Sequence, residues 1–158
     1  MNDEQYKKAA LKFLRENITA AIATSKDGTH LRAVTIYYDV DDDFNFYFLT
    51  AVNTGKYADL TENSNIGIAV GFGPPYITIQ GGGVADLVES GSDEENEIIV
   101  NINKRLHPND YHWPLFQIPR FLNAEVAVFK MTPKWLVMLN LDKEGHLDSY
   151  KEDFHTLI

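Results

Sequence analysis

The feature that most restricts the fold is a succession of strand-like runs joined by turns too short to hold a helix. Residues 18–25 and 29–38 flank Lys26-Asp27-Gly28, a turn of the Asp-Gly type, and residues 44–50 follow after a short acidic turn. Helical patterns do not alternate regularly with the strand-like runs, which favours an antiparallel sheet over a parallel α/β sheet. We therefore expect a mainly β fold, an antiparallel barrel of six to seven strands with peripheral helices.

Two further strand-like stretches of the sequence are each interrupted by residues that disfavour a regular strand. Residues 76–88 form one long run broken by Gly81-Gly82-Gly83, and glycine inside a strand indicates a bulge, a barrel bend or the close approach of a ligand. The last two runs, 125–131 and 134–141, are predicted to be a pair of strands joined at Thr132-Pro133.

Four segments are expected to contain helices. Residues 3–17 place apolar side chains at helical spacing behind two acidic residues, and a short helix is expected within 53–63. Ser92 and Glu95 form the sequence pattern of a capping box before a third amphipathic stretch that ends near residue 106. The apolar residues Tyr150, Phe154 and Leu157 of the polar tail suggest a terminal helix.

A candidate anion site lies at the start of the short central helix. Asn53 or Thr54 can cap the helix, Gly55 allows an anion to approach the backbone, and Lys56 adds a full positive charge to the first turn. Arg32, on a preceding strand, can reach the same anion from the side. The alternative is that Arg32 and Lys56 are solvated surface residues.

The same stretch resembles the FMN-binding split β-barrel family that includes pyridoxamine 5′-phosphate oxidase and general stress proteins. Three blocks carry the resemblance: Arg32-Ala33-Val34-Thr35-Ile36, Leu49-Thr50, and Lys56 followed by Leu60 and Asn63. It implies that FMN is the cofactor, with its phosphate held by Arg32, Lys56 and the Asn53-Thr54 turn and its ring against the backbone of 33–35. The residues predicted to bind the cofactor are Arg32, Ala33, Val34, Thr35, Leu49, Thr50, Asn53, Thr54, Lys56, Tyr76 and Trp135.

The resemblance further implies a homodimeric oxidoreductase that transfers hydride or electrons between FMN and a small-molecule substrate or nicotinamide donor. No residue is assigned an acid or base role. The oxidases of the family carry basic residues where this chain has Tyr37 and Gly55, and a glutamine near Tyr76, so the chain departs from their pattern. These departures favour the alternative of a non-catalytic ligand-binding or stress-response module of the same fold, holding haem, a deazaflavin or no cofactor. A purely structural interaction protein, suggested by the acidic surface and the amphipathic end helices, is a third possibility.

Composition limits the number of domains, the partners and the cellular location that we expect. The 158 residues, 44% of them hydrophobic, suit one domain over 1–158. A net charge of −9 without a basic patch argues against nucleic acid and anionic membrane surfaces as partners. The sequence has no cysteine, no apolar run of membrane-spanning length and no apolar centre of a signal peptide, so we expect a cytoplasmic protein.

The sequence gives little support for a metal site or for serine-hydrolase chemistry. The segment 107–114 holds two histidines, Asp110, Tyr111 and Trp113, but its spacing does not indicate a metal site, and its aromatic residues suit the wall of a pocket. The acidic turn 39–43 begins like a calcium loop but lacks the required glycine and final glutamate, which favours a solvated hairpin turn. No Gly-x-Ser-x-Gly elbow of a serine hydrolase occurs.

Overall fold

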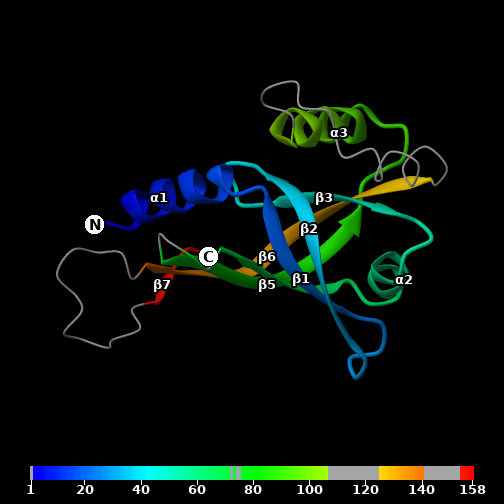
Figure 1. Ribbon diagram of the computed structural model, residues 1–158, viewed down its shortest axis with the longest axis horizontal. Coiled ribbons are helices and arrows are strands. Elements are labelled where there is room, and N and C mark those ends of the chain that lie inside the picture. Colours follow the sequence, from blue (N-terminus) through cyan, green and yellow to red (C-terminus); the bar gives the residue numbers. More distant parts are fainter. Residues whose placement is uncertain (1, 72, 74–75, 107–124, 141–153) are drawn as a thin grey trace.

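The computed structural model describes residues 2–71, 73, 76–106, 125–140 and 154–158. These residues form three helices and seven strands (Figure 1). In chain order they are α1 (Asp3–Glu16), β1 (Thr19–Ser25), β2 (Leu31–Val40), β3 (Phe46–Ala51), α2 (Gly55–Glu62), β4 (Asn65–Val70), β5 (Ile77–Leu87), α3 (Asp93–Leu106), β6 (Val126–Asn140) and β7 (Phe154–Thr156).

Six of the strands close into an antiparallel barrel. The sheet runs in the order β3-β2-β1-β4-β5-β6-β7, and an additional ladder between β3 and β6 joins its ends. Every named ladder is antiparallel, and β7 extends the sheet beyond the barrel by pairing with β6. This confirms the mainly β barrel with peripheral helices expected from the sequence.

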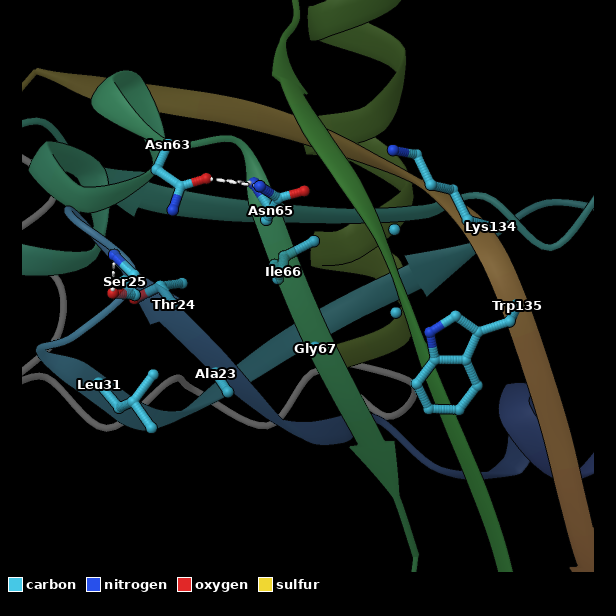
Figure 2. A pocket seen from close by; sticks show the side chains of 13 residues that line it. Ala23, Thr24, Ser25, Leu31, Asn63, Asn65, Ile66, Gly67, Lys134 and Trp135 are labelled. Carbon is cyan, nitrogen blue, oxygen red and sulfur yellow. Dashed lines mark hydrogen bonds between the residues drawn. The ribbon is translucent and has the colours of Figure 1, made fainter.

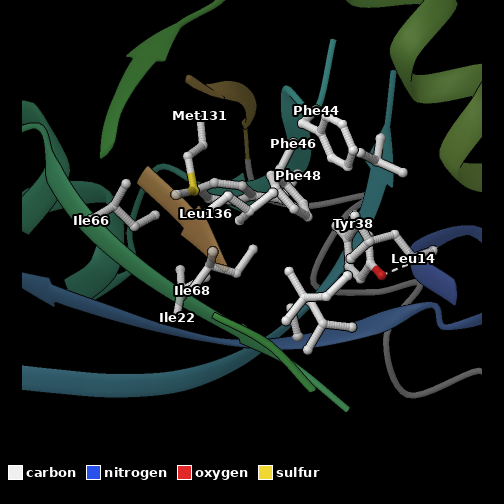
Figure 3. Packing of buried hydrophobic residues seen from close by; sticks show 14 of the residues in the cluster. Leu14, Ile22, Tyr38, Phe44, Phe46, Phe48, Ile66, Ile68, Met131 and Leu136 are labelled. Atoms are coloured by element: carbon white, nitrogen blue, oxygen red, sulfur yellow. Dashed lines mark hydrogen bonds between the residues drawn. The ribbon is translucent and has the colours of Figure 1, made fainter. Parts of the chain in front are cut away.

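The barrel is filled by the inward-facing side chains of alternate strand positions (Figure 3). On β3 the inward residues are Phe46, Phe48 and Thr50, and the ring of Phe48 stacks with that of Phe129. Helix α1 contributes Leu14 to this core, and the buried hydroxyl of Tyr38 donates a 2.6 Å hydrogen bond to the Leu14 carbonyl. This bond joins β2 to α1, whereas the end of β1 contacts α2, where the Thr24 hydroxyl donates to Asp59.

Helix α3 lies outside the barrel, against the outer face of β3 and β6. Its buried residues Ile98 and Ile102 pack with Val128, and Leu49 joins this second cluster. The predicted capping box forms in part: the Ser92 hydroxyl accepts from the Glu95 amide at 3.1 Å, but the Glu95 carboxylate accepts from the amide of Gly91, the residue before Ser92.

The C-terminal strands differ from the prediction. Residues 126–140 form the single strand β6, not two strands joined at Thr132-Pro133. Proline is tolerated because Pro133 faces Gly83 where the register shifts, and a bulge leaves one residue of the strand unpaired. The predicted terminal helix is also wrong for the described part of the tail, since Phe154–Thr156 is extended and bonded to β6.

The acidic turn after β2 is organised around Asp41. Its Oδ1 accepts from the amides of Asp43 and Asn45, and its Oδ2 accepts from the Asn45 amide group and the Tyr47 hydroxyl, all within 3.0 Å. Burial alone raises the pKa of the Asp41 carboxyl, but these hydrogen bonds outweigh it and hold the pKa below its ordinary 3.8. The predicted hairpin turn is thus confirmed, with Asp41 satisfying its backbone donors.

Asp41→Asn is expected to reduce stability in a pH-dependent way. A lowered folded-state pKa means that the ionised carboxylate stabilises the fold fully above about pH 5, and that this contribution is lost as the pH falls through 3.8 toward the folded value. The stability difference between wild type and Asp41→Asn, measured by urea unfolding, should therefore shrink between about pH 6 and pH 3. A difference that stays constant across this range would contradict the assignment.

Candidate functional site

The predicted anion site is built where β1 and β2 meet the first turn of α2. Tyr57 and Leu60 hold α2 against the barrel: Leu60 is buried, and the Tyr57 ring packs edge-on against Phe129. The register that pairs Arg32 with Thr24 places Arg32 on the inward face of β2 at this end of the barrel, beside α2. Its side chain is about half exposed, so its charge is accessible.

Arg32 lies along α2. Its Nε donates a 2.9 Å hydrogen bond to Oδ2 of Asp59, and the rest of its guanidinium lies against Gly55, one helical turn earlier. A Cβ on Gly55 would approach the Cζ atom of Arg32 and lie 2.5 Å from Nη2 and 2.7 Å from Nη1. The guanidinium thus fills the space from which a side chain at position 55 would extend.

Asp59 is the buried partner of this cation. Its side chain is 9% exposed, and its Oδ2 also accepts a 2.9 Å hydrogen bond from the Thr24 hydroxyl. The hydrogen bond from Arg32 lowers the pKa of the Asp59 carboxyl below its ordinary value against the opposing effect of burial, and the Thr24 hydrogen bond adds to the lowering. Asp59 is therefore ionised at neutral pH and offsets one positive charge.

Two hydroxyls lie beside the same helix start. Thr54 is the N-cap of α2: its Oγ1 accepts weakly from the Tyr57 amide at 3.4 Å, and its carbonyl accepts from Ala58. The Thr50 and Thr54 hydroxyl oxygens are 2.8 Å apart and hydrogen-bonded. The Thr54 hydroxyl donates to the Ala51 carbonyl at 2.8 Å, so the donors that the first turn of α2 offers to an anion are its backbone amides and the guanidinium of Arg32.

A groove of about 520 Å³ opens next to this cluster, on the outer face of β1, β4, β5 and β6 (Figure 2). The half-exposed indole of Trp135 lies over β5, where Gly82 leaves room for it. Neither Arg32 nor Lys56 lines the groove, but Thr24 does, and it is bonded to the Asp59 that holds Arg32. The groove and the cation cluster are therefore adjacent regions linked through Thr24 and Asp59.

The sequence-predicted residues divide into several groups. Arg32, Thr50, Thr54 and Lys56 gather around the start of α2, and Asn53 is an exposed residue just before it. Ala33 and Thr35 face outward on β2, where Ala33 pairs with the groove residue Ala23, whereas Val34 packs against the core. Trp135 lies in the groove and Tyr76 is exposed at an isolated bridge with Gly73.

Leu49 lies apart from these groups. Adjacent strand residues face opposite sides, so Leu49 points away from Thr50 and packs beneath α3. The segment 107–114 lies outside the described residues. Within the described part of the chain, no three histidine or acidic side chains are grouped to hold a metal ion, and no helix has the length and apolar character needed to cross a bilayer.

Sequence reasoning missed Asp59. An acidic residue next to the buried Leu60 in a short helix was a usable signal, because the spacing of four from Gly55 places it on the same side of α2. Its partner could not be inferred, because Arg32 is 27 residues away and meets Asp59 only where β2 lies beside α2 in the fold.

Comparison with solved structures identifies the fold. No protein-family model and no curated protein matches the chain. Among solved structures, a candidate pyridoxamine 5′-phosphate oxidase from Listeria innocua has a TM-score of 0.65 at 16% identity, over 85% of this chain and 98% of that one. General Stress Protein 26 from Bacillus anthracis has a TM-score of 0.60 at 15% identity, over 84% of this chain and 92% of that one.

A third solved structure carries a different description. HutZ from Vibrio cholerae, described as a haem storage protein, has a TM-score of 0.65 at 14% identity, over 82% of this chain and 91% of that one. These likenesses confirm the resemblance inferred from the sequence at the level of the fold. The chain has the split β-barrel fold of pyridoxamine 5′-phosphate oxidase-like and general stress proteins.

Proposed function

We propose that the protein is an FMN-binding flavoprotein that acts as an oxidoreductase. The observation that carries the proposal is the guanidinium of Arg32 lying against Gly55 in the first turn of α2, immediately before Lys56. Two cations and the backbone amides of a helix start are donors that suit a phosphate group. The split-barrel fold supports the choice of a flavin.

In this proposal each part of FMN has its own residues. The phosphate is held by Arg32, Lys56 and the turn 53–54, and the isoalloxazine ring lies along the outer face of β2 at 33–35. The Trp135 groove, which adjoins Ala33 through the paired residue Ala23, offers an aromatic wall to a planar ring. When bound, FMN supplies hydride or electron transfer, with a nicotinamide donor or small-molecule substrate as its partner.

The proposal includes a homodimer and a cytoplasmic location. Residues that face outward on β1 and β4 are small, among them Ala21, Ala23 and Gly67, so another backbone can approach this face closely. The exposed Leu31 and the half-exposed Trp135 lie along the same groove, and burying their apolar surface against a second subunit would be favourable. Light scattering of the purified protein tests the dimer, since a monomer mass would contradict it.

Lys56→Ala is expected to weaken FMN binding by about 1.5–3 kcal/mol, the effect of losing a hydrogen bond to a charged group. The measurement is the dissociation constant obtained from flavin fluorescence. Lys12→Ala serves as a control, because Lys12 is a solvent-exposed residue of α1 paired only loosely with Glu16. Unchanged affinity in Lys56→Ala would contradict the phosphate assignment.

The colour of the purified protein tests the cofactor itself. A yellow protein whose flavin absorbance changes on adding NADH or NADPH would support the oxidoreductase. A colourless preparation that does not take up added FMN would exclude it and leave the second candidate.

That second candidate is a non-catalytic module of the same fold that binds haem, a deazaflavin or no cofactor. It is favoured by the carboxylate of Asp59, which offsets the charge of Arg32 and so reduces the attraction for a doubly charged phosphate. The likeness to the haem storage protein HutZ points the same way. Titration of the colourless protein with haemin, followed by its visible absorbance, distinguishes the two candidates.

A further inference from the structure

Arg32 is held by α2 at two points. Nε is bonded to Asp59, and the end that carries Nη1 and Nη2 lies against Gly55 in the first turn of the helix. A guanidinium is planar and has five N–H donors, so a hydrogen bond at Nε fixes its plane and leaves four donors on Nη1 and Nη2. These four donors lie at the start of α2, where the phosphate is proposed to bind.

Asp59 is itself held in place. Its carboxylate is 9% exposed and accepts from both Thr24 and Arg32 on the same oxygen, 2.9 Å in each case. It cannot turn toward a ligand at the helix start without leaving both partners. Asp59 therefore influences the direction of donors toward a ligand at the helix start through Arg32 and not by a contact of its own.

Gly55 is the third part of the arrangement. A side chain at this position would occupy the space of the guanidinium, whose Nη1 and Nη2 would lie 2.7 Å and 2.5 Å from its Cβ. Real Cβ atoms do not approach other atoms this closely, so the guanidinium of Arg32 would have to shift from its present place. The absence of a side chain at 55 thus allows Arg32 to supply the positive charge at this point of the site.

We propose that Asp59 is a positioning residue for ligand recognition: through Nε it aims the Nη1 and Nη2 groups of Arg32 at the terminal phosphate of the ligand, across the space left by Gly55. This inference rests on the proposed function, because it assigns a role within the same phosphate site. It also predicts a change in anion affinity opposite to the one expected from charge alone. Removing a negative charge from a site that binds an anion should weaken the binding, because the lost orientation outweighs the gained charge.

The test compares FMN with riboflavin, which lacks the phosphate, in wild type and in Asp59→Asn. The isosteric amide keeps a hydrogen-bonding oxygen but loses the charge that holds Arg32. Asp59→Asn should bind FMN about tenfold more weakly, the loss expected when one charge-assisted contact is misaligned. Its affinity for riboflavin should be unchanged. In an Arg32→Ala background the same substitution should cause no further loss of FMN affinity, because the orienting effect of Asp59 requires Arg32.

A matched control separates orientation from net charge. Glu62→Gln removes a carboxylate from the same helix, but Glu62 pairs with Lys26 and not with Arg32. It should leave FMN affinity unchanged. Tighter or unchanged FMN binding by Asp59→Asn, an equal loss for riboflavin, or an equal loss in the Arg32→Ala background would overturn the proposal.

A second measurement keeps this inference separate from the proposed function. If the wild type binds neither flavin, the flavin assignment fails, and inorganic phosphate then becomes the probe. The Arg32 Nε–H signal in a ¹⁵N spectrum, assigned by its loss in Arg32→Ala, should shift on adding phosphate to the wild type and remain unshifted in Asp59→Asn. A wild-type signal that does not respond to phosphate would overturn the positioning role as well.

Discussion

Arg105→Ala is expected to lower the free energy of unfolding by about 3 kcal/mol, the lower end of the cost of removing one partner from a buried ion pair, because this pair is partly buried. Arg105 is near the end of α3, and its side chain is only 17% exposed. Nη1 donates to Oδ1 of Asp39 at 2.9 Å, and the guanidinium lies 5.1 Å from the centre of the Tyr38 ring. Truncation would leave the carboxylate of Asp39, 21% exposed, without this partner.

Arg105 also completes the C-terminus of α1. Its Nη2 contacts the carbonyl oxygens of Leu14, Arg15 and Asn17 at 2.8–3.3 Å. The last carbonyls of a helix have no partner within the helix and carry a partial negative charge, so a cation here both bonds and stabilises them. One side chain thus joins α3, α1 and β2, and its loss affects all three contacts together.

The control for this prediction is Arg15→Ala. Arg15 pairs with Asp42 at 2.5 Å, but the two side chains are 48% and 85% exposed, and exposed pairs contribute about 0–1 kcal/mol. Urea unfolding of both variants measures the difference. Arg105→Lys should recover only part of the loss, because one ammonium cannot match the planar fork that reaches Asp39 and the carbonyls. A loss in Arg105→Ala no larger than in Arg15→Ala would show that solvent replaces these contacts.

The barrel was predictable because its signals are local. The turn at Asp27-Gly28 requires a residue with positive φ, and Gly28 has φ of 81°. Alternating apolar residues on β3 and the capping pattern of α3 are likewise contained within a few residues. Strand boundaries at such places follow from backbone geometry and side-chain alternation, which a single sequence displays.

The candidate site was only partly predictable, because its contacts join distant segments. Arg32 and Lys56 were found from their places in the sequence and Thr50 from the family resemblance, but the Arg32–Asp59 pair depends on how β2 lies beside α2. Leu49 shows the opposite case: strand alternation alone separates it from Thr50, although both were grouped in one motif. The prediction of two strands in place of β6 was wrong for a third reason. Thr132-Pro133 has the composition of a turn, but the strand continues through it by means of a bulge opposite Gly83.

Gly83→Ala is expected to lower the free energy of unfolding by about 3 kcal/mol, the upper end of the usual cost of overpacking. Gly83 lies in β5 opposite Pro133, where the ladder with β6 shifts register. A Cβ at this position would overlap the carbonyl oxygen of Thr132 and lie 2.7 Å from Cα of Pro133. Both are backbone atoms of the paired strand, so they cannot move aside as a side-chain rotamer can. Urea unfolding gives the measurement.

The neighbouring substitution Gly82→Ala separates this backbone clash from a general intolerance of side chains in the triple glycine. A Cβ on Gly82 would meet the indole of Trp135, 2.6 Å from Nε1, and that side chain is half exposed and can swing into solvent. Gly82→Ala should therefore cost less than about 1 kcal/mol while shifting Trp135 fluorescence toward that of a solvated indole. A Trp113→Phe background makes Trp135 the sole tryptophan for this reading. Equal losses of stability at the two positions would mean that β5 moves as a whole to admit a methyl group. In that case Gly83 would not determine the register shift that keeps β6 continuous through Pro133.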